Sequence, residues 1–325
     1  MKPAMKLGKC LLLVAACAMT MLAQAQTWPT KPIRLVVPLS AGGGTDQIAR
    51  MLATRLSESL GQQIFIDNRP GAGGNVGSDH VAKSPTDGYT LLVGTSASHA
   101  SNVSLYGSKM PYDAVKDFTP ITLIGYTPLI LMAHPSLGVE SVKDLIARAR
   151  ATPGAINYGS SGNGTASQLG MEYIKRQADI NIVHIPYKGA GQATQDLLAG
   201  HVSVQFDSVP AALPLVRSGK LKALGVTSLK RMSIAPEIPP IADTLPGFEY
   251  TAWIGFLGPA NMPPSVVQRL NTELVRILGL PDVRAQLASS GFEASPTSPE
   301  DFSSLIKADI VKLGKIVAAS GAKLD

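Results

Sequence analysis

Short apolar runs alternate with amphipathic stretches along most of this chain, and this alternation restricts the folds open to it. Residues 33–37 form a nearly continuous apolar run, which is typical of a strand covered on both faces of its sheet. A glycine-rich loop follows, and then Ile48, Leu52 and Leu56 recur at helical spacing before Gly61. Because strands alternate with helices, the sequence predicts an α/β fold with mostly parallel sheets and right-handed crossovers.

The same pattern repeats to the end of the chain. Further strands are predicted at 64–66, 89–93, 121–125, 129–133, 156–158, 182–185, 202–206, 221–226 and 253–257. Further helices are predicted near 76–82 and at 141–151, 165–177, 190–199, 209–218, 264–279, 281–289 and 299–319. At about 100–200 residues per domain, the chain is long enough for two domains of ordinary size.

The first 25 residues carry the features of a secretory signal peptide. Lysines occupy positions 2, 6 and 9, residues 10–22 are apolar and uncharged, and the small-x-small pattern Ala23-Gln24-Ala25 follows. The apolar run is shorter than the roughly 20 residues that span a bilayer. We therefore expect cleavage after Ala25, secretion, and a mature chain that begins at Gln26.

Cleavage changes the composition on which functional arguments depend. The full chain has a net charge of +6, and the loss of three lysines lowers it to +3. No cluster of five or more basic residues occurs, so nucleic-acid binding is not expected. The two cysteines, Cys10 and Cys17, also lie in the leader, so we expect neither a disulfide nor thiol chemistry. A lipid anchor at Cys17 is the alternative, since residues 14–17 resemble a lipobox.

The first glycine-rich loop, residues 38–46, joins the carboxyl end of a strand to the start of a helix. Ligands of open α/β sheets bind at this end of the strands, and a helix start offers free N–H groups to an anion. Glycines let the backbone approach the ligand closely. The predicted contacts are Leu39, Ser40, Ala41, Gly42, Gly43, Thr45 and Asp46. Helix capping is the alternative role for Thr45 and Asp46.

The second glycine-rich loop, residues 159–165, has the same position between a strand and a helix. It supplies three hydroxyl groups, an amide and several backbone N–H groups without any charge, which suits a carboxylate held by neutral donors. The predicted contacts are Ser160, Ser161, Gly162, Asn163, Gly164 and Thr165. Two such loops, more than a hundred residues apart, are expected to hold opposite ends of one ligand.

Three further polar residues follow predicted strands and are weaker candidates for ligand contacts. Ser96 follows strand 89–93, Lys188 follows strand 182–185, and Asp207 ends strand 202–206. Lys188 is alternatively a solvated loop lysine that adds only long-range charge. Asp207 is alternatively the cap of the next helix.

Motifs for other chemistries fail on inspection. Gly42-x-Gly44 has Gln47 where a dinucleotide fingerprint needs its third glycine, and no phosphate-binding P-loop occurs. Ser161 has Asn163 where a nucleophile elbow needs glycine. The five histidines form no HExxH pair, so each is expected to be a surface or core residue and no metal or cofactor is expected. The carboxylates show no clear catalytic pairing either, although a pairing in space would leave no such signal.

Five segments together resemble one known family. In chain order they read IRLVVPLSAGGGTDQIAR, DNRPGAGGNVGSDHVAKSPTDGYTLLVGT, INYGSSGNGTASQLGMEYI, VHIPYKGAGQATQDLLAGHV and LKALGVTS. They resemble the Bug/TctC family, the periplasmic substrate-binding receptors of tripartite tricarboxylate transporters, over nearly the whole mature chain. The resemblance implies a type II periplasmic-binding-protein fold, with residues 26–126 plus 252–325 in lobe 1 and residues 127–251 in lobe 2. It also implies a monomer that binds a carboxylate in the interlobe cleft and delivers it to membrane permease subunits. No catalysis is implied, so the chain is predicted not to be an enzyme.

One departure from the family bears on the ligand. The family's first loop usually reads VPFAPGG, whereas this chain has Leu39 in place of the aromatic ring and Ala41 in place of the second proline. We expect a dicarboxylate, and the smaller Leu39 motivates the hypothesis that it is aromatic. Two alternatives remain at this point: an extracytoplasmic sensing protein, and a secreted hydrolase that uses Ser160 or Ser161 with a neighbouring histidine base.

Overall fold

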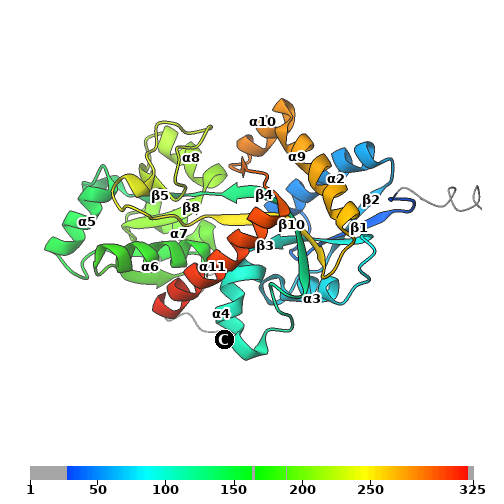
Figure 1. Ribbon diagram of the computed structural model, residues 1–325. Coiled ribbons are helices and arrows are strands. Elements are labelled where there is room, and N and C mark those ends of the chain that lie inside the picture. Colours follow the sequence, from blue (N-terminus) through cyan, green and yellow to red (C-terminus); the bar gives the residue numbers. More distant parts are fainter. Residues whose placement is uncertain (1–27, 163–164, 188, 321–325) are drawn as a thin grey trace, which may run out of the picture.

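The computed structural model describes residues 28–162, 165–187 and 189–320. In these ranges the chain forms two mixed sheets, each flanked by helices, that occupy the two halves of the molecule (Figure 1). None of the helices in the described ranges is long and apolar enough to cross a membrane. The predicted signal peptide and the predicted contacts Asn163, Gly164 and Lys188 lie outside the described residues.

The first sheet has the order β11-β4-β10-β3-β1-β2 and takes strands from both ends of the chain. Its strands are β1 (Ile33–Val37), β2 (Ile64–Asn68), β3 (Thr90–Thr95), β4 (Phe118–Thr127), β10 (Ala252–Pro259) and β11 (Glu293–Ala294). Its helices are α2 (Gly44–Leu60), α3 (Asn75–Ala82), α4 (Asn102–Tyr106), α9 (Pro264–Gly279), α10 (Pro281–Ser289) and α11 (Pro299–Ser320). Short single turns η1 (Ala72–Gly74), η2 (Ala97–Ser101) and η3 (Gly107–Lys109) connect these elements.

The second sheet has the order β7-β6-β8-β5-β9 and is built from the middle of the chain. Its strands are β5 (Leu129–Ala133), β6 (Asn157–Ser160), β7 (Val183–Pro186), β8 (Val204–Ser208) and β9 (Lys222–Val226). Its helices are α5 (Val142–Ala151), α6 (Ala166–Ala178), α7 (Ala190–Leu198) and α8 (Val209–Arg217), with short turns η4 (Pro135–Leu137) and η5 (Ile241–Asp243).

The prediction of mostly parallel sheets is wrong. Strands β1, β2 and β3 are parallel, and so are β6, β7 and β8. Strand β10, however, runs antiparallel to β3 and β4, and β5 runs antiparallel to β8 and β9. These antiparallel strands are the ones next to the two points where the chain passes between the sheets. A strand that enters a sheet from its carboxyl edge must run against the parallel set.

Helix α2 shows how local sequence sets the first glycine-rich loop. Its buried residues include Ile48, Leu52 and Leu56, which recur on one face and pack on the first sheet. The helix ends at Gly61, whose φ of 68° allows its N–H to bond back to the carbonyl of Ser57. It begins at Gly44, earlier than its apolar pattern, so Thr45 and Asp46 lie inside the first turn and do not cap it.

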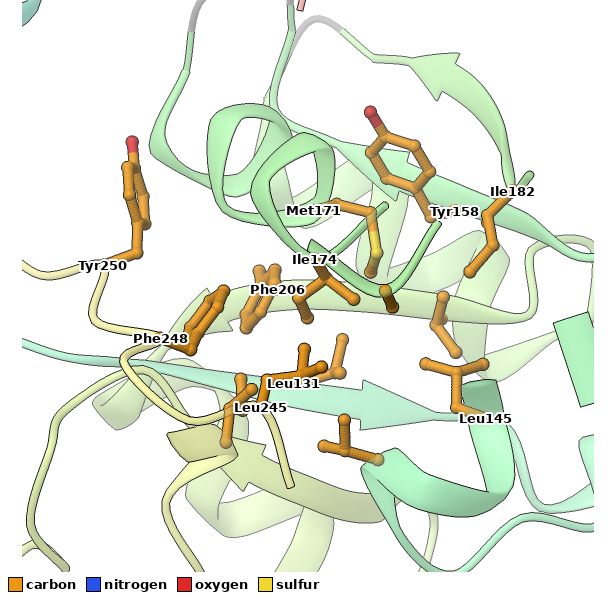
Figure 2. Packing of buried hydrophobic residues seen from close by; sticks show 14 of the residues in the cluster. Leu131, Leu145, Tyr158, Met171, Ile174, Ile182, Phe206, Leu245, Phe248 and Tyr250 are labelled. Atoms are coloured by element: carbon orange, nitrogen blue, oxygen red, sulfur yellow. The ribbon is translucent and has the colours of Figure 1, made fainter. Parts of the chain in front are cut away.

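The core of the second sheet is a layer of apolar side chains between α6 and the strands. Figure 2 shows Met171 and Ile174 of α6 facing Phe206 of β8 and Leu131 of β5, and all four are buried. The hydroxyl of Tyr158 points away from this layer (Figure 2) and donates to a carboxylate oxygen of Glu172 at 2.7 Å. The packed strands and α6 thus give the second glycine-rich loop a rigid base on both sides.

The two halves also touch away from the chain crossings. Helix α11 packs against β4 and α4 of the first half and against α6 of the second (Figure 1). On the α10 side, the Glu293 carboxylate accepts bonds from the N–H and hydroxyl of Ser233 at 2.9 and 3.0 Å. A Cβ at Gly291 would lie 2.6 Å from Cβ of Val209, so this glycine permits a close approach to α8.

Candidate functional site

The strand registers bring the carboxyl edges of the two sheets to the chain crossings. Ser208, the last residue of β8, pairs with Leu129, which begins β5 two residues after β4 ends. In the other sheet Thr95, the last residue of β3, pairs with Ile254 near the start of β10. Because β1 is parallel to β3, and β6 to β8, the two glycine-rich loops leave edges that face the same pair of crossings.

A buried carboxylate clamps the first loop. Asp46 is only 1% exposed, and its Oδ2 accepts bonds from the Gly42 N–H at 2.8 Å and from Arg50 Nε at 2.9 Å. Its Oδ1 accepts a bond from the Asn68 side chain at 2.9 Å. Burial raises the pKa of Asp46, but the bonds from Arg50, Gly42 and Asn68 outweigh this and lower the pKa. The predicted ligand contact Asp46 therefore has both oxygens engaged within the protein, where it ties loop, helix and β2 together.

The clamp leaves the start of α2 open to an anion. Gly43 is the N-cap, and no side chain caps the helix. The first backbone bond of the helix runs from the Gln47 N–H to the Gly43 carbonyl at 3.0 Å. The N–H groups of Gly44, Thr45 and Asp46 have no acceptor among the described residues. These N–H donors form the positive end of the helix dipole, and the adjoining residues 40–43 are exposed.

The other loops of this edge brace the first. A Cβ on Gly74 would lie 3.4 Å from Cβ of Ser98 and 3.6 Å from Cβ of Pro38, so three loops meet here. Ser96, a predicted contact, is 8% exposed, and its Oγ accepts a bond from the Trp253 N–H at 3.3 Å. Leu39 is half-buried and packs against the apolar core of the first sheet. The structure thus gives Ser96 and Leu39 internal contacts at the edge of the site.

The second loop is held by hydroxyl groups. Ser160 Oγ accepts a bond from the Gly162 N–H at 3.2 Å, and Thr165 Oγ1 donates to the Gly162 carbonyl at 2.7 Å. The Ser161 N–H donates to Ser167 Oγ at 3.0 Å. Gly162 has a φ of +123°, which a side chain rarely adopts, so glycine is required at this position. In the described part of the loop, the predicted contacts form a neutral turn at the carboxyl end of β6.

A partly buried histidine lies against this loop. His184 Nε2 is 2.7 Å from Ser160 Oγ, and the ring stacks on Tyr158 with centroids 4.7 Å apart. Burial lowers the pKa of His184; the charge of Glu172 opposes this shift and that of Lys175 adds to it. The parallel pairing of β6 with β7 brings His184 level with Tyr158.

The serine–histidine contact does not have the geometry of a hydrolase. The Ser160 side chain is fully buried, so its Oγ is out of reach of a substrate carbonyl. The amide nitrogen of Gln168 lies 3.4 Å from His184 Nδ1. A catalytic triad has a carboxylate at this position. The pair therefore positions the loop.

Asp207 has the environment of a structural carboxylate. It is 7% exposed, and its Oδ2 accepts a bond from Thr194 Oγ1 at 3.0 Å. Its Oδ1 accepts a bond from the N–H of Ser208, the N-cap of α8, at 2.7 Å. Because Ser208 is the N-cap and no side chain caps α8, the structure does not give Asp207 the capping role that was its alternative. Arg50, Asn68, Ser167 and His184 are the residues that the sequence reasoning missed, and of these only Arg50 had a clear signal, four residues after Asp46 on the same helix.

The comparisons with known proteins agree on one family. The family model described as tripartite tricarboxylate transporter family receptor matches residues 48–322. The chain is 36% identical over 302 residues to Protein BugT of Bordetella pertussis, covering 92% of each. It is also 36% identical over 292 residues to a UPF0065 protein in the tcbD–tcbE intergenic region of Pseudomonas sp. strain P51, covering 89% of this chain and 86% of that protein.

Solved structures give the same answer for the fold. A structure titled R. palustris Rpa4515 with adipate is 39% identical, with a TM-score of 0.75, and is covered in full by 91% of this chain. MatC from Rhodopseudomonas palustris with bound malate is 30% identical, with a TM-score of 0.70, and is covered in full by 89% of this chain. A TctC solute-binding protein from Polaromonas, at 24% identity and a TM-score of 0.80, shares the fold.

Proposed function

The chain belongs to the tripartite tricarboxylate transporter receptor family, and we propose that it captures a dicarboxylate between its two lobes and delivers it to membrane permease subunits. The observation that carries the proposal is the uncapped start of α2, whose free N–H groups lie at one carboxyl edge while the neutral serine loop lies at the other. One carboxylate would bind each edge. Adipate and malate in the related structures are acids of this class.

The proposal includes the organisation expected from the sequence. The fold is that of periplasmic binding proteins, with two α/β lobes. Lobe 1 would comprise residues 26–126 and 252–325, and lobe 2 residues 127–251. The mature protein would act as a monomer in the periplasm after cleavage of residues 1–25. Closure of the lobes would enclose the ligand and form the surface that the permease recognises.

A thermal-shift screen of the mature chain, residues 26–325, tests the proposal. Mono- and dicarboxylates of four to eight carbons are added well above their expected dissociation constants, and the matched control is the neutral monoamide of each monoacid and the neutral diamide of each diacid. At a hundredfold excess over Kd, binding adds about 2.7 kcal/mol to the free energy of unfolding and raises Tm by several degrees. We expect a shift with at least one diacid and none with its diamide. Equal shifts with both, or no shift with any acid, would contradict the proposal.

A further inference from the structure

A pocket of about 270 Å³ opens beside the first turn of α2. Gly44 and Thr45 form its rim on the side of the free N–H groups, and Gln47, Ile48 and Met51 continue along the helix. The chain-crossing strands and α10 form the opposite walls. The pocket therefore adjoins the position proposed for one carboxylate.

The walls of this pocket are apolar at depth. Ile254 of β10, Leu287 of α10 and Phe292 are each 6% exposed or less, and they belong to the same core cluster as Ile48. The rim carries neutral polar groups, including Gln286 and Ser290. An apolar cavity of about 150 Å³ already holds a benzene ring. A pocket of this size and lining thus accommodates a phenyl ring or a short alkyl chain.

Charge decides which part of a ligand can enter. Every residue that lines the pocket is uncharged. The nearest carboxylate on α2, Asp46, is buried and paired with Arg50. A second carboxylate placed in the pocket would lose its hydration without gaining a cation, which is costly. The pocket is therefore unsuited to the far end of a linear diacid and suited to an uncharged branch of the ligand.

We infer that the ligand is a dicarboxylate with an apolar substituent next to one carboxylate, and that this substituent occupies the pocket between α2 and α10. This inference rests on the proposed function, because the free N–H groups of α2 must first hold the carboxylate. It also changes which residues support the hypothesis of an aromatic ligand. Leu39 packs into the core and does not line this pocket, whereas Ile254, Leu287 and Phe292 do.

Calorimetry with two acids that differ only in the substituent tests the inference. Succinate and 2-phenylsuccinate carry the same pair of carboxylates, so their difference in affinity reports the ring. Ser290→Trp fills the pocket, and Ser289→Trp is the matched control on the neighbouring exposed serine, which does not line it. Gln286→Trp is a second filling variant. Circular dichroism verifies the fold of each.

We expect the wild type and Ser289→Trp to bind 2-phenylsuccinate at least tenfold more tightly than succinate. In Ser290→Trp and Gln286→Trp this preference should fall to twofold or less, with the affinity for succinate unchanged. Equal affinities of the wild type for the two acids would overturn the inference, as would equal preferences in Ser290→Trp and Ser289→Trp. It is also overturned if other carboxylates bind and neither of these does. If no carboxylate in the screen binds, the proposed function itself fails.

Discussion

His99 couples the stability of the first sheet and its loops to pH. Its side chain is fully buried in η2, which follows β3, and its ring lies 4.6 Å from that of Phe118 and 5.9 Å from that of Tyr112. Its Nδ1 lies 2.9 Å from Ser98 Oγ, and its Nε2 has no hydrogen-bond partner among the described residues. Burial lowers the pKa of His99 to about 3.

The size of the effect follows from this pKa. In the unfolded chain a histidine titrates near 6.5, so between about pH 6.5 and 3 the unfolded state binds more protons than the native state. The contribution of His99 to stability is therefore complete above about pH 6.5 and is lost as the pH falls. At pH 5.0 the free energy of unfolding is lower by about 2 kcal/mol from this residue alone.

Denaturant unfolding at pH 7.5 and 5.0 measures this loss. Other groups titrate over the same interval, so the informative quantity is the difference between wild type and His99→Gln in their loss of stability. We expect the variant to be less stable at pH 7.5 but to lose about 2 kcal/mol less on acidification. The reasoning is refuted if His99→Gln and wild type lose equal amounts, or if NMR shows His99 titrating near pH 6.5 in the native protein.

Three further predictions concern the loops. Gly42→Val should weaken carboxylate binding at least tenfold by calorimetry, because Gly42 has a φ of +82°, which valine cannot adopt without strain. Gly43→Val is the control: Gly43 has a φ of −72°, so its affinity for the carboxylate should change less than threefold. Asp46→Asn should lower the free energy of unfolding, measured in urea, by about 1–3 kcal/mol, because the amide NH₂ of asparagine would face buried hydrogen-bond donors. An unchanged unfolding midpoint would contradict the role of Asp46 in holding the first loop. His184→Gln should weaken binding about tenfold, the value of one net hydrogen bond to Ser160, with little change in Tm. Equal affinities of His184→Gln and wild type would show that Ser160 holds the loop alone.

Most elements could be predicted because their ends are marked in the sequence. The predicted strand 33–37 and the predicted helices 264–279 and 281–289 have the bounds that the structure gives. Each is a periodic apolar segment that begins or ends at proline, glycine or a polar turn, and such segments must bury one face wherever they pack. Their order in the sheets could not be read in this way, since β10 and β5 have the same apolar composition as their parallel neighbours.

The stretch 97–106 was missed because its burial is polar. Ser98, His99, Ser101 and Asn102 are all buried, so the segment has no apolar period from which to predict a helix. Its polar groups bond to one another and to neighbouring loops, as where Asn102 donates to the Asn75 side chain at 2.8 Å. Burial of a polar side chain is tolerated when a partner is present, and partners distant in sequence leave no local signal.

Charges within the site explain why its specificity should depend on shape. Asp46 is neutralised by Arg50, and the described hydroxyl groups of the second loop carry no charge. Under the proposed function, attraction for an anion would therefore come from the free N–H groups and dipole of α2 and from the neutral second loop. Such donors accept any carboxylate at the correct spacing. Discrimination among acids must then come from what lies between and beside the two ends, where the pocket lined by Ile254 and Phe292 offers apolar volume without a cation.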